Sequence, residues 1–335
     1  MKKKILITGG AGFIGFHLAR AIQKEGHHIT ILDNLSRNDS DPEFENLIDQ
    51  ENVHFFNVDL TQKLFYGHLS DYYDEIYHLA AINGTKYFYE KPYEVLRVNI
   101  LSLLNMIEWV DSNNTGKFLF TSSSETYAGT INRFGSLVNY IPTNEDIPLC
   151  IDEVFNERFS YGGSKLAGEL LTINYFKKLD VPFSIVRYHN IYGPRMGFEH
   201  VIPEFCKRIY TKADPFVVFG GEVTRAFCYI ADAIKGTLLA MRNSNTDNQI
   251  LHIGNSDEEV KIIDLAQLML KLTDLNVSIK VNEAPIGSVQ RRCPDVSKIK
   301  KITGYSCKVT LEEGLRKTLD WYLTQFEEIE PMSKY

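Results

Sequence analysis

The stretch Thr8-Gly9-Gly10-Ala11-Gly12-Phe13-Ile14-Gly15 decides the fold of this chain. It follows a short apolar run, Lys4–Thr8, and leads into an amphipathic segment, Phe13–Lys24, which predicts a strand, a tight turn and a helix in succession. Glycines allow the backbone of such a turn to approach a pyrophosphate, and the amide groups at the start of the helix favour negative charge. An ordinary glycine turn is the alternative interpretation.

Asp33 decides between these interpretations. It ends the next predicted strand, 18 residues after Gly15, where a carboxylate can accept hydrogen bonds from both ribose hydroxyls of an adenosine. Gly10, Gly12 and Gly15 also match the G-x-G-x-x-G spacing. The strand, the helix and the acid together predict a dinucleotide site. Because a carboxylate repels a 2′-phosphate, we expect NAD rather than NADP.

Short apolar runs alternate with helix-length segments through the rest of the first half. This spacing is typical of strand–helix–strand units, which form a parallel sheet with helices on both faces. The predicted fold class is therefore α/β, with a Rossmann-type, doubly wound parallel sheet. Its predicted strands are Lys4–Thr8, His28–Leu32, Val53–Val58, Glu75–Leu79, Lys117–Thr121 and Val181–Tyr188.

The pattern changes near Asn190, where prolines and the Gly220-Gly221 pair divide the chain into shorter elements. We expect residues 1–188 to form an NAD-binding domain, to which 225–253 return, and residues 189–335 to form mainly a smaller, mixed α/β substrate lobe. Ligands of doubly wound sheets bind at the carboxyl ends of the strands, so a site between the lobes is expected. Helices are predicted at Ile230–Arg242, Ile262–Leu272 and Leu311–Phe326.

Composition excludes several classes of protein. The chain has 335 residues, of which 44% are hydrophobic and 24% charged, as in ordinary globular proteins. A net charge of −7 without a long basic run argues against nucleic acid, and no apolar stretch is long enough for a membrane span. Five scattered cysteines and the absence of a secretion signal favour the cytoplasm. The nine histidines form no metal-ligand spacing, so no metal is expected.

Two further motifs carry chemistry. In Tyr161-Gly162-Gly163-Ser164-Lys165 the i, i+4 spacing puts a phenol and an ammonium on one helix face, where the lysine charge lowers the pKa of the tyrosine. The tyrosine can then accept a hydroxyl proton during hydride transfer. Thr121–Tyr127 (TSSSETY) follows a predicted strand and supplies hydroxyls that can bind a substrate alcohol. A core tyrosine, a solvated lysine and a polar strand end are the structural alternatives.

These motifs together resemble the extended short-chain dehydrogenase/reductases that modify nucleotide sugars, namely epimerases, 4,6-dehydratases and decarboxylases. The resemblance runs from Lys4 to about Trp321 and includes D-N-L-S at Asp33–Ser36 and H-L-A-A at His78–Ala81. Further matches are R-Y-x-N-x-Y-G-P-R at Arg187–Arg195, T-R-A-F at Thr224–Phe227 and R-R-C-P-D at Arg291–Asp295.

The resemblance implies specific roles. Ser123 binds the sugar O4, Tyr161 is the base at C4, and Lys165 holds the nicotinamide ribose; Ser124 and Glu125 complete the expected catalytic set. The expected NAD contacts are Gly9, Gly12, Phe13, Ile14, Gly15, Asp33, Asn34, Ser36, Asp59, Leu60, Ala80, Ala81, Asn99, Tyr161 and Lys165. The expected contacts to a nucleotide-diphosphate sugar are Lys86, Asn190, His200, Val201, Arg225 and Arg292, with Asn190, Arg225 and Arg292 at the diphosphate.

Ser124 and Glu125 bear on the reaction within the family. The resemblance implies that plain 4-epimerases usually lack this acid, whereas 4,6-dehydratases and hexuronate decarboxylases carry it, and a carboxylate beside C5 could remove the acidified C5 proton. Lys86–Tyr89 with Pro92, and Gly193–Met196, look like the decarboxylase branch. We therefore expect oxidation at C4 followed by lyase chemistry at C5. The alternatives are a 4-epimerase and, more remotely, a non-catalytic nucleotide-binding regulator.

Two features concern assembly. The resemblance implies a homodimer in which Val95–Val110 and the helix 161–178 pair across a two-fold axis; the alternative is that both helices serve one subunit only. The segment between Tyr127 and Tyr161 is about ten residues longer than is usual in the family. The sequence assigns no role to this extra length.

Overall fold

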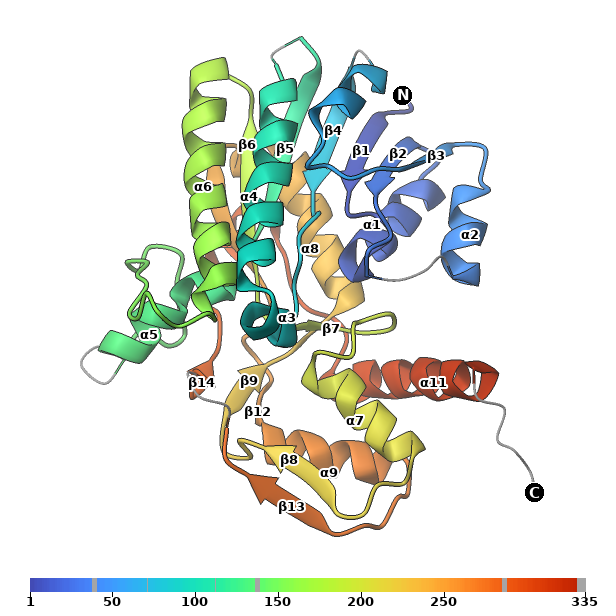
Figure 1. Cartoon of the computed structure of the whole chain (residues 1–335), viewed down its shortest axis with the longest axis vertical. Coiled ribbons are helices and arrows are strands. Elements are labelled where there is room, and N and C mark those ends of the chain that lie inside the picture. The colour runs from blue at the N-terminus through green and yellow to red at the C-terminus, as the bar shows by residue number, and fades with distance from the viewer. Residues whose placement is uncertain (38–40, 71, 112, 136–138, 285–287, 330–335) are drawn as a thin grey trace.

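The structure is a computed structural model that describes residues 1–37, 41–70, 72–111, 113–135, 139–284 and 288–329. A parallel seven-stranded sheet forms the larger part of the molecule, in the order β11-β6-β5-β4-β1-β2-β3 (Figure 1). Its strands are β1 (Lys4–Thr8), β2 (His28–Asp33), β3 (Val53–Asn57), β4 (Tyr73–His78), β5 (Thr115–Ser123), β6 (Phe183–Tyr188) and β11 (Gln249–Ile253). The predicted α/β fold is confirmed, and the ends of the six predicted strands differ by no more than two residues.

Helices cover both faces of the sheet, as the strand–helix alternation predicts. α4 (Pro92–Trp109) and α6 (Phe159–Leu179) pack together on one face, and α1 (Phe13–Lys24) and α8 (Ile230–Arg242) on the other (Figure 1). The first-half connections also contain α2 (Pro42–Ile48), η1 (Lys63–His68), α3 (Thr85–Glu90), η2 (Ser124–Tyr127) and α5 (Ala128–Phe134). The predicted bounds of Phe13–Lys24 and Ile230–Arg242 are those observed.

The sheet is apolar on both faces because alternate residues of each strand enter separate cores. In β1, Ile5 and Ile7 belong to one core cluster and Leu6 to the other, and all three are fully buried. Strands buried on both faces require nearly continuous apolar sequence, which explains why this chain shows runs such as KILIT rather than alternation.

The smaller lobe lies beyond the carboxyl ends of the strands (Figure 1). It contains three small sheets, with strand orders β10-β7, β12-β9-β14 and β13-β8. Its elements are β7 (Ile191–Tyr192), α7 (Val201–Tyr210), β8 (Phe216–Phe219), β9 (Thr224–Ala226), β10 (Cys228–Tyr229), β12 (Glu259–Lys261), α9 (Ile262–Leu272), β13 (Ile279–Asn282), β14 (Arg291–Arg292) and α11 (Leu311–Ile329). α10 (Ser297–Thr303) packs instead against β11 and α8 of the large sheet layer. A short helix, η3 (Ser244–Thr246), lies between α8 and β11, which belong to the large sheet layer.

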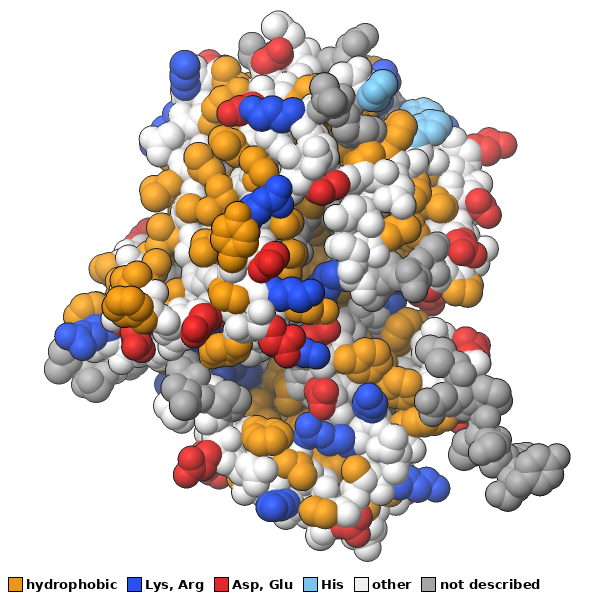
Figure 2. All heavy atoms as spheres, in the orientation of Figure 1, with side chains coloured by type: hydrophobic (Ala, Val, Ile, Leu, Met, Phe, Trp, Pro, Cys, Tyr) orange, Lys and Arg blue, Asp and Glu red, His pale blue; other side chains and the backbone are white. Residues whose placement is uncertain are grey.

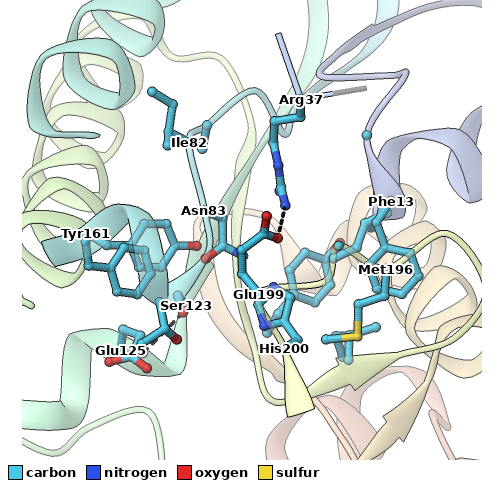
Figure 3. Close-up of a pocket in the computed structure, with 18 of the residues that line it drawn as sticks. Phe13, Arg37, Ile82, Asn83, Ser123, Glu125, Tyr161, Met196, Glu199 and His200 are labelled. Atoms are coloured by element: carbon cyan, nitrogen blue, oxygen red, sulfur yellow. Dashed lines mark hydrogen bonds and ion pairs between the residues drawn. The ribbon is translucent and has the colours of Figure 1, made fainter. Parts of the chain in front are cut away.

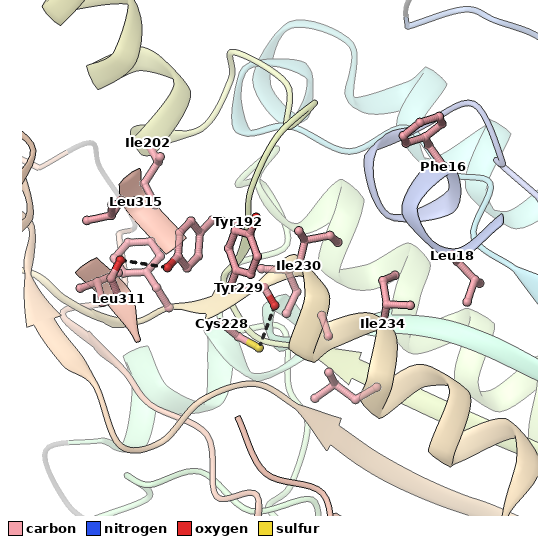
Figure 4. Packing of buried hydrophobic residues seen from close by; sticks show 14 of the residues in the cluster. Phe16, Leu18, Tyr192, Ile202, Cys228, Tyr229, Ile230, Ile234, Leu311 and Leu315 are labelled. Atoms are coloured by element: carbon pink, nitrogen blue, oxygen red, sulfur yellow. Dashed lines mark hydrogen bonds between the residues drawn. The ribbon is translucent and has the colours of Figure 1, made fainter. Parts of the chain in front are cut away.

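One continuous apolar core joins the two lobes. Tyr192 and Tyr229 pack at 5.6 Å between ring centroids, and the Tyr192 hydroxyl donates to the carbonyl of Leu311 at the start of α11 (Figure 4). The same cluster includes Phe16 of α1 and Ile202 of α7 (Figure 4). The smaller lobe is therefore fixed on the larger one by side chains that far-separated segments contribute.

A buried polar network lies where β5 ends and η2 begins. Glu169 of α6 accepts hydrogen bonds from the Ser122 hydroxyl at 2.5 Å and from Arg187 Nε and Nη2 at 2.8 and 2.6 Å. Arg187 also donates to the Tyr127 hydroxyl, which lies 2.6 Å from Nε2 of His252. Each of these five side chains is nearly or fully buried. The network links β5, β6, β11 and α6 at the edge of the sheet where the site lies.

No helix in the described part of the chain is long and apolar enough to cross a membrane.

Close packing of α6 on the sheet can be tested at Gly168. A Cβ atom there would lie 2.4 Å from Cζ of Phe120, so Gly168→Ala should push the helix outward and lower the free energy of unfolding by about 1–3 kcal/mol. Gly163 of the same helix is the control, because its nearest neighbour would be 3.6 Å away and alanine favours helix by about 0.5–1 kcal/mol. Urea denaturation that shows Gly168→Ala to be as stable as wild type would contradict this packing.

Candidate active site

A cavity of about 680 Å³ opens where the carboxyl ends of the strands face the smaller lobe. Its walls come from the β1–α1 turn, the segments after β2 to β5, the start of α6, and the residues around α7, β8 and β9. Side chains of both charges gather on the surface where the two lobes meet (Figure 2). The site therefore lies at the predicted edge of the sheet.

The glycine turn forms one end of the cavity. Gly9 has φ +72°, and a Cβ atom on it would lie 2.7 Å from the backbone nitrogen of Ala80. A Cβ atom on Gly15 would lie 2.1 Å from the Gly9 carbonyl oxygen. No side chain caps the start of α1, so the first amide groups of the helix remain for a ligand, and a pyrophosphate suits them.

Asp33 lies beside this turn at the end of β2. Its Oδ2 accepts from the backbone nitrogen of Ala11 at 3.0 Å and its Oδ1 from that of Leu35 at 2.9 Å. Burial raises the pKa of the carboxyl group, and the backbone hydrogen bonds oppose this shift. Each oxygen keeps a further lone pair for a ribose hydroxyl. The turn, the uncapped helix start and this acid together fit the adenosine half of NAD.

Almost all expected cofactor residues line the cavity. Besides those of the turn and Asp33, they are Asn34, Ser36, Asp59, Leu60, Ala80, Ala81, Tyr161 and Lys165. Asn99 is the exception: it lies behind the cavity wall, where its amide pairs with both backbone groups of Ile82 and donates to the Ser164 hydroxyl. Its position supports the wall and α6 rather than a direct contact.

The two residues of α6 that are expected to be catalytic, Tyr161 and Lys165, lie in its first turns. The Tyr161 ring stacks on Phe88, with 4.7 Å between the centroids, and Figure 3 shows its hydroxyl on the same side of the cavity as Ser123. Lys165 Nζ lies 5.7 Å from the Tyr161 centroid and donates to the carbonyl of Thr121 at 2.8 Å. Lys165 is 3% exposed, which excludes the solvated alternative.

The predicted lowering of the Tyr161 pKa is wrong. Burial raises the pKa of Tyr161, and the Ser123 hydroxyl only partly offsets this. Burial also lowers the pKa of Lys165 to about 7, although Glu169 opposes the shift. The physical reason is that Lys165 binds a backbone carbonyl rather than the phenol, so its charge does little for the phenolate.

Glu125 is held between two arginines. Its carboxylate accepts from Arg158 Nη2 at 3.1 Å on both oxygens and from Arg292 Nη1 at 2.9 Å. Burial alone would raise the pKa of Glu125, but Arg292 and Arg158 lower it to about 2. A carboxylate with so low a pKa is a weak base, which argues against the suggested removal of a C5 proton by Glu125.

The substrate side of the cavity contains most of the expected residues. Arg225 donates to the carbonyls of Thr224 and Val289, and burial together with Arg292 lowers its pKa to about 9. Asn190 Nδ2 donates to the carbonyl of Ala226 at 3.1 Å. His200 and Val201 begin α7 and line the cavity, as does Ser124. Arg292 donates to Glu125, the residue that is expected beside C5 of the sugar. It therefore lies nearer to the expected position of the sugar than its assignment to the diphosphate implies.

Lys86 is not brought to the cavity. Thr85 and Phe88, one turn apart on α3, line it, whereas Lys86 is exposed and pairs with Glu90 at 3.9 Å. The short helix turns Lys86 away from the face that its neighbours present. His189 is fully buried, with 4.5 Å between its ring centroid and that of His252, and does not line the cavity.

The sequence patterns indicated neither Arg158 nor the ion pair between Arg37 and Glu199. Arg158 precedes Tyr161 by three residues, which puts it beside the catalytic tyrosine, and this spacing could have revealed it. Arg37, after β2, donates to Glu199, before α7, at 3.2 Å across the cavity (Figure 3). This contact joins segments 162 residues apart, and no local pattern indicates it. In the described ranges, no group of three His, Cys, Asp or Glu could hold a metal ion.

Similarity to known proteins identifies the family of this chain. The model of the NAD dependent epimerase/dehydratase family matches residues 5–254. This chain belongs to that family. Its cofactor is accordingly NAD, and nucleotide sugars are the substrates that its relatives' names indicate.

Individual relatives include more than one reaction. The chain is 35% identical to UDP-N-acetyl-alpha-D-glucosaminuronate decarboxylase of Bacillus cytotoxicus, over 96% of this chain and 98% of the relative. It is 28% identical to UDP-glucuronate 4-epimerase of Thermodesulfobacterium geofontis, over 94% and 95%. A variant of UDP-glucuronic acid 4-epimerase from Bacillus cereus, in complex with UDP-4-deoxy-4-fluoro-glucuronic acid and NAD, superposes with a TM-score of 0.84 at 27% identity, covering 96% and 99%.

The choice of cofactor can be tested at Asp33. Asp33→Ala should weaken NAD binding by about 10- to 100-fold, because hydrogen bonds to a charged group are lost, and should narrow the difference between NAD and NADP. Asp33→Asn keeps one acceptor oxygen and should weaken NAD less while still relieving repulsion of the 2′-phosphate. Fluorescence titration with both nucleotides measures this, and tighter binding of NADP than NAD by the wild type would contradict it.

Proposed function

We propose that this enzyme oxidises C4 of a nucleoside diphosphate hexuronate and then decarboxylates it at C5. The observation that carries the proposal is the buried Arg158–Glu125–Arg292 arrangement, with Arg225 beside it. Among the relatives, one named a uronate decarboxylase at 35% identity supports the same reaction.

The arginines around Glu125 carry more positive charge than this one carboxylate neutralises. Three buried or half-buried arginines, Arg158, Arg225 and Arg292, surround Glu125. Nε of Arg158, and Nε and Nη2 of Arg292, have no hydrogen-bond partner among the described residues. Buried guanidinium groups with free donors favour anions, and arginine suits carboxylate and phosphate alike. A substrate that carries a sugar carboxylate in addition to its diphosphate fits this surplus.

The low pKa of Glu125 favours decarboxylation over 4,6-dehydration. A dehydratase needs a base that removes the C5 proton, and a carboxylate with a pKa of about 2 serves poorly. In a 4-keto uronate the carboxylate is β to the ketone, so cleavage of the C5–C6 bond releases carbon dioxide and leaves its electron pair in an enolate at C4–C5. No base is needed at C5 for this step, and a proton then adds to C5.

The first step assigns roles to the remaining residues. Tyr161 accepts the O4 proton while Ser123 binds that oxygen. Bound NAD would supply the oxidant for the C4 hydride, and its reduced form would return that hydride to C4 after carbon dioxide has left. Lys165 lies 5.7 Å from the Tyr161 ring centroid and donates to the carbonyl of Thr121, so we assign it to holding the nicotinamide ribose rather than to stabilising the phenolate. Glu125 positions Arg158 and Arg292 at the C5 substituent.

A uronate 4-epimerase is the second candidate. The same arginines could bind a sugar carboxylate without cleaving it, and the relatives named as uronate 4-epimerases favour this possibility. The two reactions share the first oxidation and differ only in what happens at C5.

A panel of UDP-, dTDP-, GDP- and CDP-sugars, analysed by mass spectrometry in D₂O, separates the candidates. We expect a hexuronate to lose carbon dioxide and to gain one deuterium at C5. Loss of water would identify a dehydratase, and an isomer of unchanged mass without deuterium would identify a 4-epimerase. Turnover of the true substrate without deuterium at C5 would therefore end the lyase proposal.

Variants at Tyr161 and Arg158 test the roles of those residues. Tyr161→Phe should abolish reduction of bound NAD, because loss of a general base typically costs about 10²–10⁴-fold. Arg158→Met should lower kcat/KM for the uronate by about 10- to 100-fold, and Arg158→Lys by less, since a charge-assisted hydrogen bond to the carboxylate is lost. NADH formation from the matching neutral hexose is the control, and an equal loss there would contradict the assigned role of Arg158.

We also propose that the enzyme is a cytoplasmic homodimer that pairs through α4 and α6. The outward side of these helices exposes apolar residues, including Tyr93, Leu96 and Leu170 (Figure 2 shows the hydrophobic atoms over α4 and α6). Such side chains on two adjacent helices favour a four-helix contact between two copies.

The dimer proposal is tested by Leu170→Glu. This charge should dissociate the dimer at micromolar concentration, because an unpaired carboxylate is costly in an apolar contact. Val281→Glu is a matched control, since Val281 on β13 and Leu170 are both 55% exposed. Sedimentation equilibrium should show a dimer for wild type and Val281→Glu; a wild-type mass of one chain would refute the pairing.

A further inference from the structure

The extra length between Tyr127 and Tyr161 ends in an exposed apolar segment, Ile151–Phe155, which we call the arm. Val154 and Phe155 are 84% and 91% exposed, and Ile151 is also exposed. Single exposed apolar residues are common, but an adjacent valine and phenylalanine that are both almost fully exposed are a costly surface. The residues directly after the arm return to the cavity.

The arm continues the apolar side of α6. Ile151 Cδ1 lies 3.6 Å from the position that a Cβ atom on Gly163 would take, so the arm begins against the first turns of the helix. The region of α5 and the following loop lies at the foot of α6 (Figure 1), and hydrophobic atoms cover this part of the surface as well as α4 and α6 (Figure 2). Exposed apolar side chains therefore occur both on α6, at Leu170, and at its foot, in the arm.

Charge favours a second copy of the same chain as the occupant of this surface. Asp152, Glu153 and Glu157 of the arm region are exposed. The α3–α4 region carries three exposed bases, Lys86, Lys91 and Arg97, and two exposed acids, Glu90 and Glu94, around the apolar side chains of Tyr93 and Leu96, so its net charge is opposite in sign to that of the arm region. An isologous contact lets the arm of each copy meet the α3–α4 region of the other, which offers opposite charge and an exposed aromatic ring.

The arm is connected to the site by a short path of turns. The Asn156 nitrogen donates to the Glu153 carbonyl at 3.2 Å, and the Arg158 nitrogen donates to Oδ1 of Asn156 at 3.0 Å. Phe159 and Ser160 donate in turn to Asn156 and Glu157, which leads directly into α6. Arg158 lies three residues beyond Phe155, so a contact that fixes the arm also fixes the base of the Arg158 side chain.

We propose that the arm packs against the α3–α4 region of a second copy of this chain and so holds Arg158 against Glu125. The proposal rests on the α4–α6 dimer and on the role of Arg158 proposed above, and it adds a contact and a function for the extra segment. The partner copy completes the site indirectly, through the backbone that carries Arg158.

The test uses Phe155→Ser and Val154→Ser in the full chain, with Val281→Ser as the matched control for loss of an exposed valine. Sedimentation velocity over a dilution series should show the dimer dissociation constant raised by at least about 10-fold in Phe155→Ser and unchanged in Val281→Ser. Thermal unfolding identical to wild type at high concentration establishes that the variants fold. On dilution, kcat/KM of Phe155→Ser for the uronate should fall and should recover when the protein is concentrated.

The outcomes separate this proposal from the earlier ones. If Leu170→Glu dissociates the dimer but Phe155→Ser does not, the arm lies outside the contact and the proposal is refuted while the α4–α6 dimer stands. If the dimer of the Phe155→Ser variant dissociates but the kcat/KM of this variant is independent of dilution, the link to Arg158 is refuted. Sedimentation requires no substrate, so a different reaction found by the sugar panel would leave the arm contact standing.

Discussion

The buried carboxylate of Glu169 is the contact on which the arrangement of the site depends. An isolated charge in this position would be very unfavourable, and the bidentate pair with Arg187 and the hydrogen bond from Ser122 compensate it. Because Glu169 belongs to α6, Ser122 to β5 and Arg187 to β6, these partners fix the helix of Tyr161 and Lys165 relative to the loop of Ser123 and Glu125. The two halves of the catalytic set, which different segments supply, are thereby held in one geometry.

The electrostatics of the cavity are arranged for anions. At one end the uncapped start of α1 presents backbone amides, and at the other three arginines share a single carboxylate. Burial lowers the pKa of Arg225 to about 9 and that of Lys165 to about 7. A nearby anion favours the protonated form of a cationic group, so both groups gain from an anion in the cavity.

The sequence predicted those parts of the protein that local patterns determine. The glycine turn, Asp33 and the Tyr161–Lys165 pair follow from fixed spacings on a strand, a turn or a helix, and the structure gathers them around one cavity. The partners of Glu125 could not be predicted, because Arg158 and Arg292 reach it from segments 33 and 167 residues away. Lys86 shows that a motif can also mislead. The motif predicted Lys86 at the site, but the orientation of the short helix α3 turns Thr85 and Phe88 towards the cavity and Lys86 away from it. Likewise, the spacing of Tyr161 and Lys165 did not reveal that the lysine binds the Thr121 carbonyl.

The ion pair between Arg37 and Glu199 has a consequence for the exchange of molecules with solvent. It bridges the loop after β2 and the loop before α7, and therefore the two lobes on either side of the cavity (Figure 3). Both side chains are partly exposed, so dissolved salt screens their attraction. The contact between these two loops is then weaker at high ionic strength, and the residence time of an occupant in the cavity becomes a property of the medium as well as of the protein.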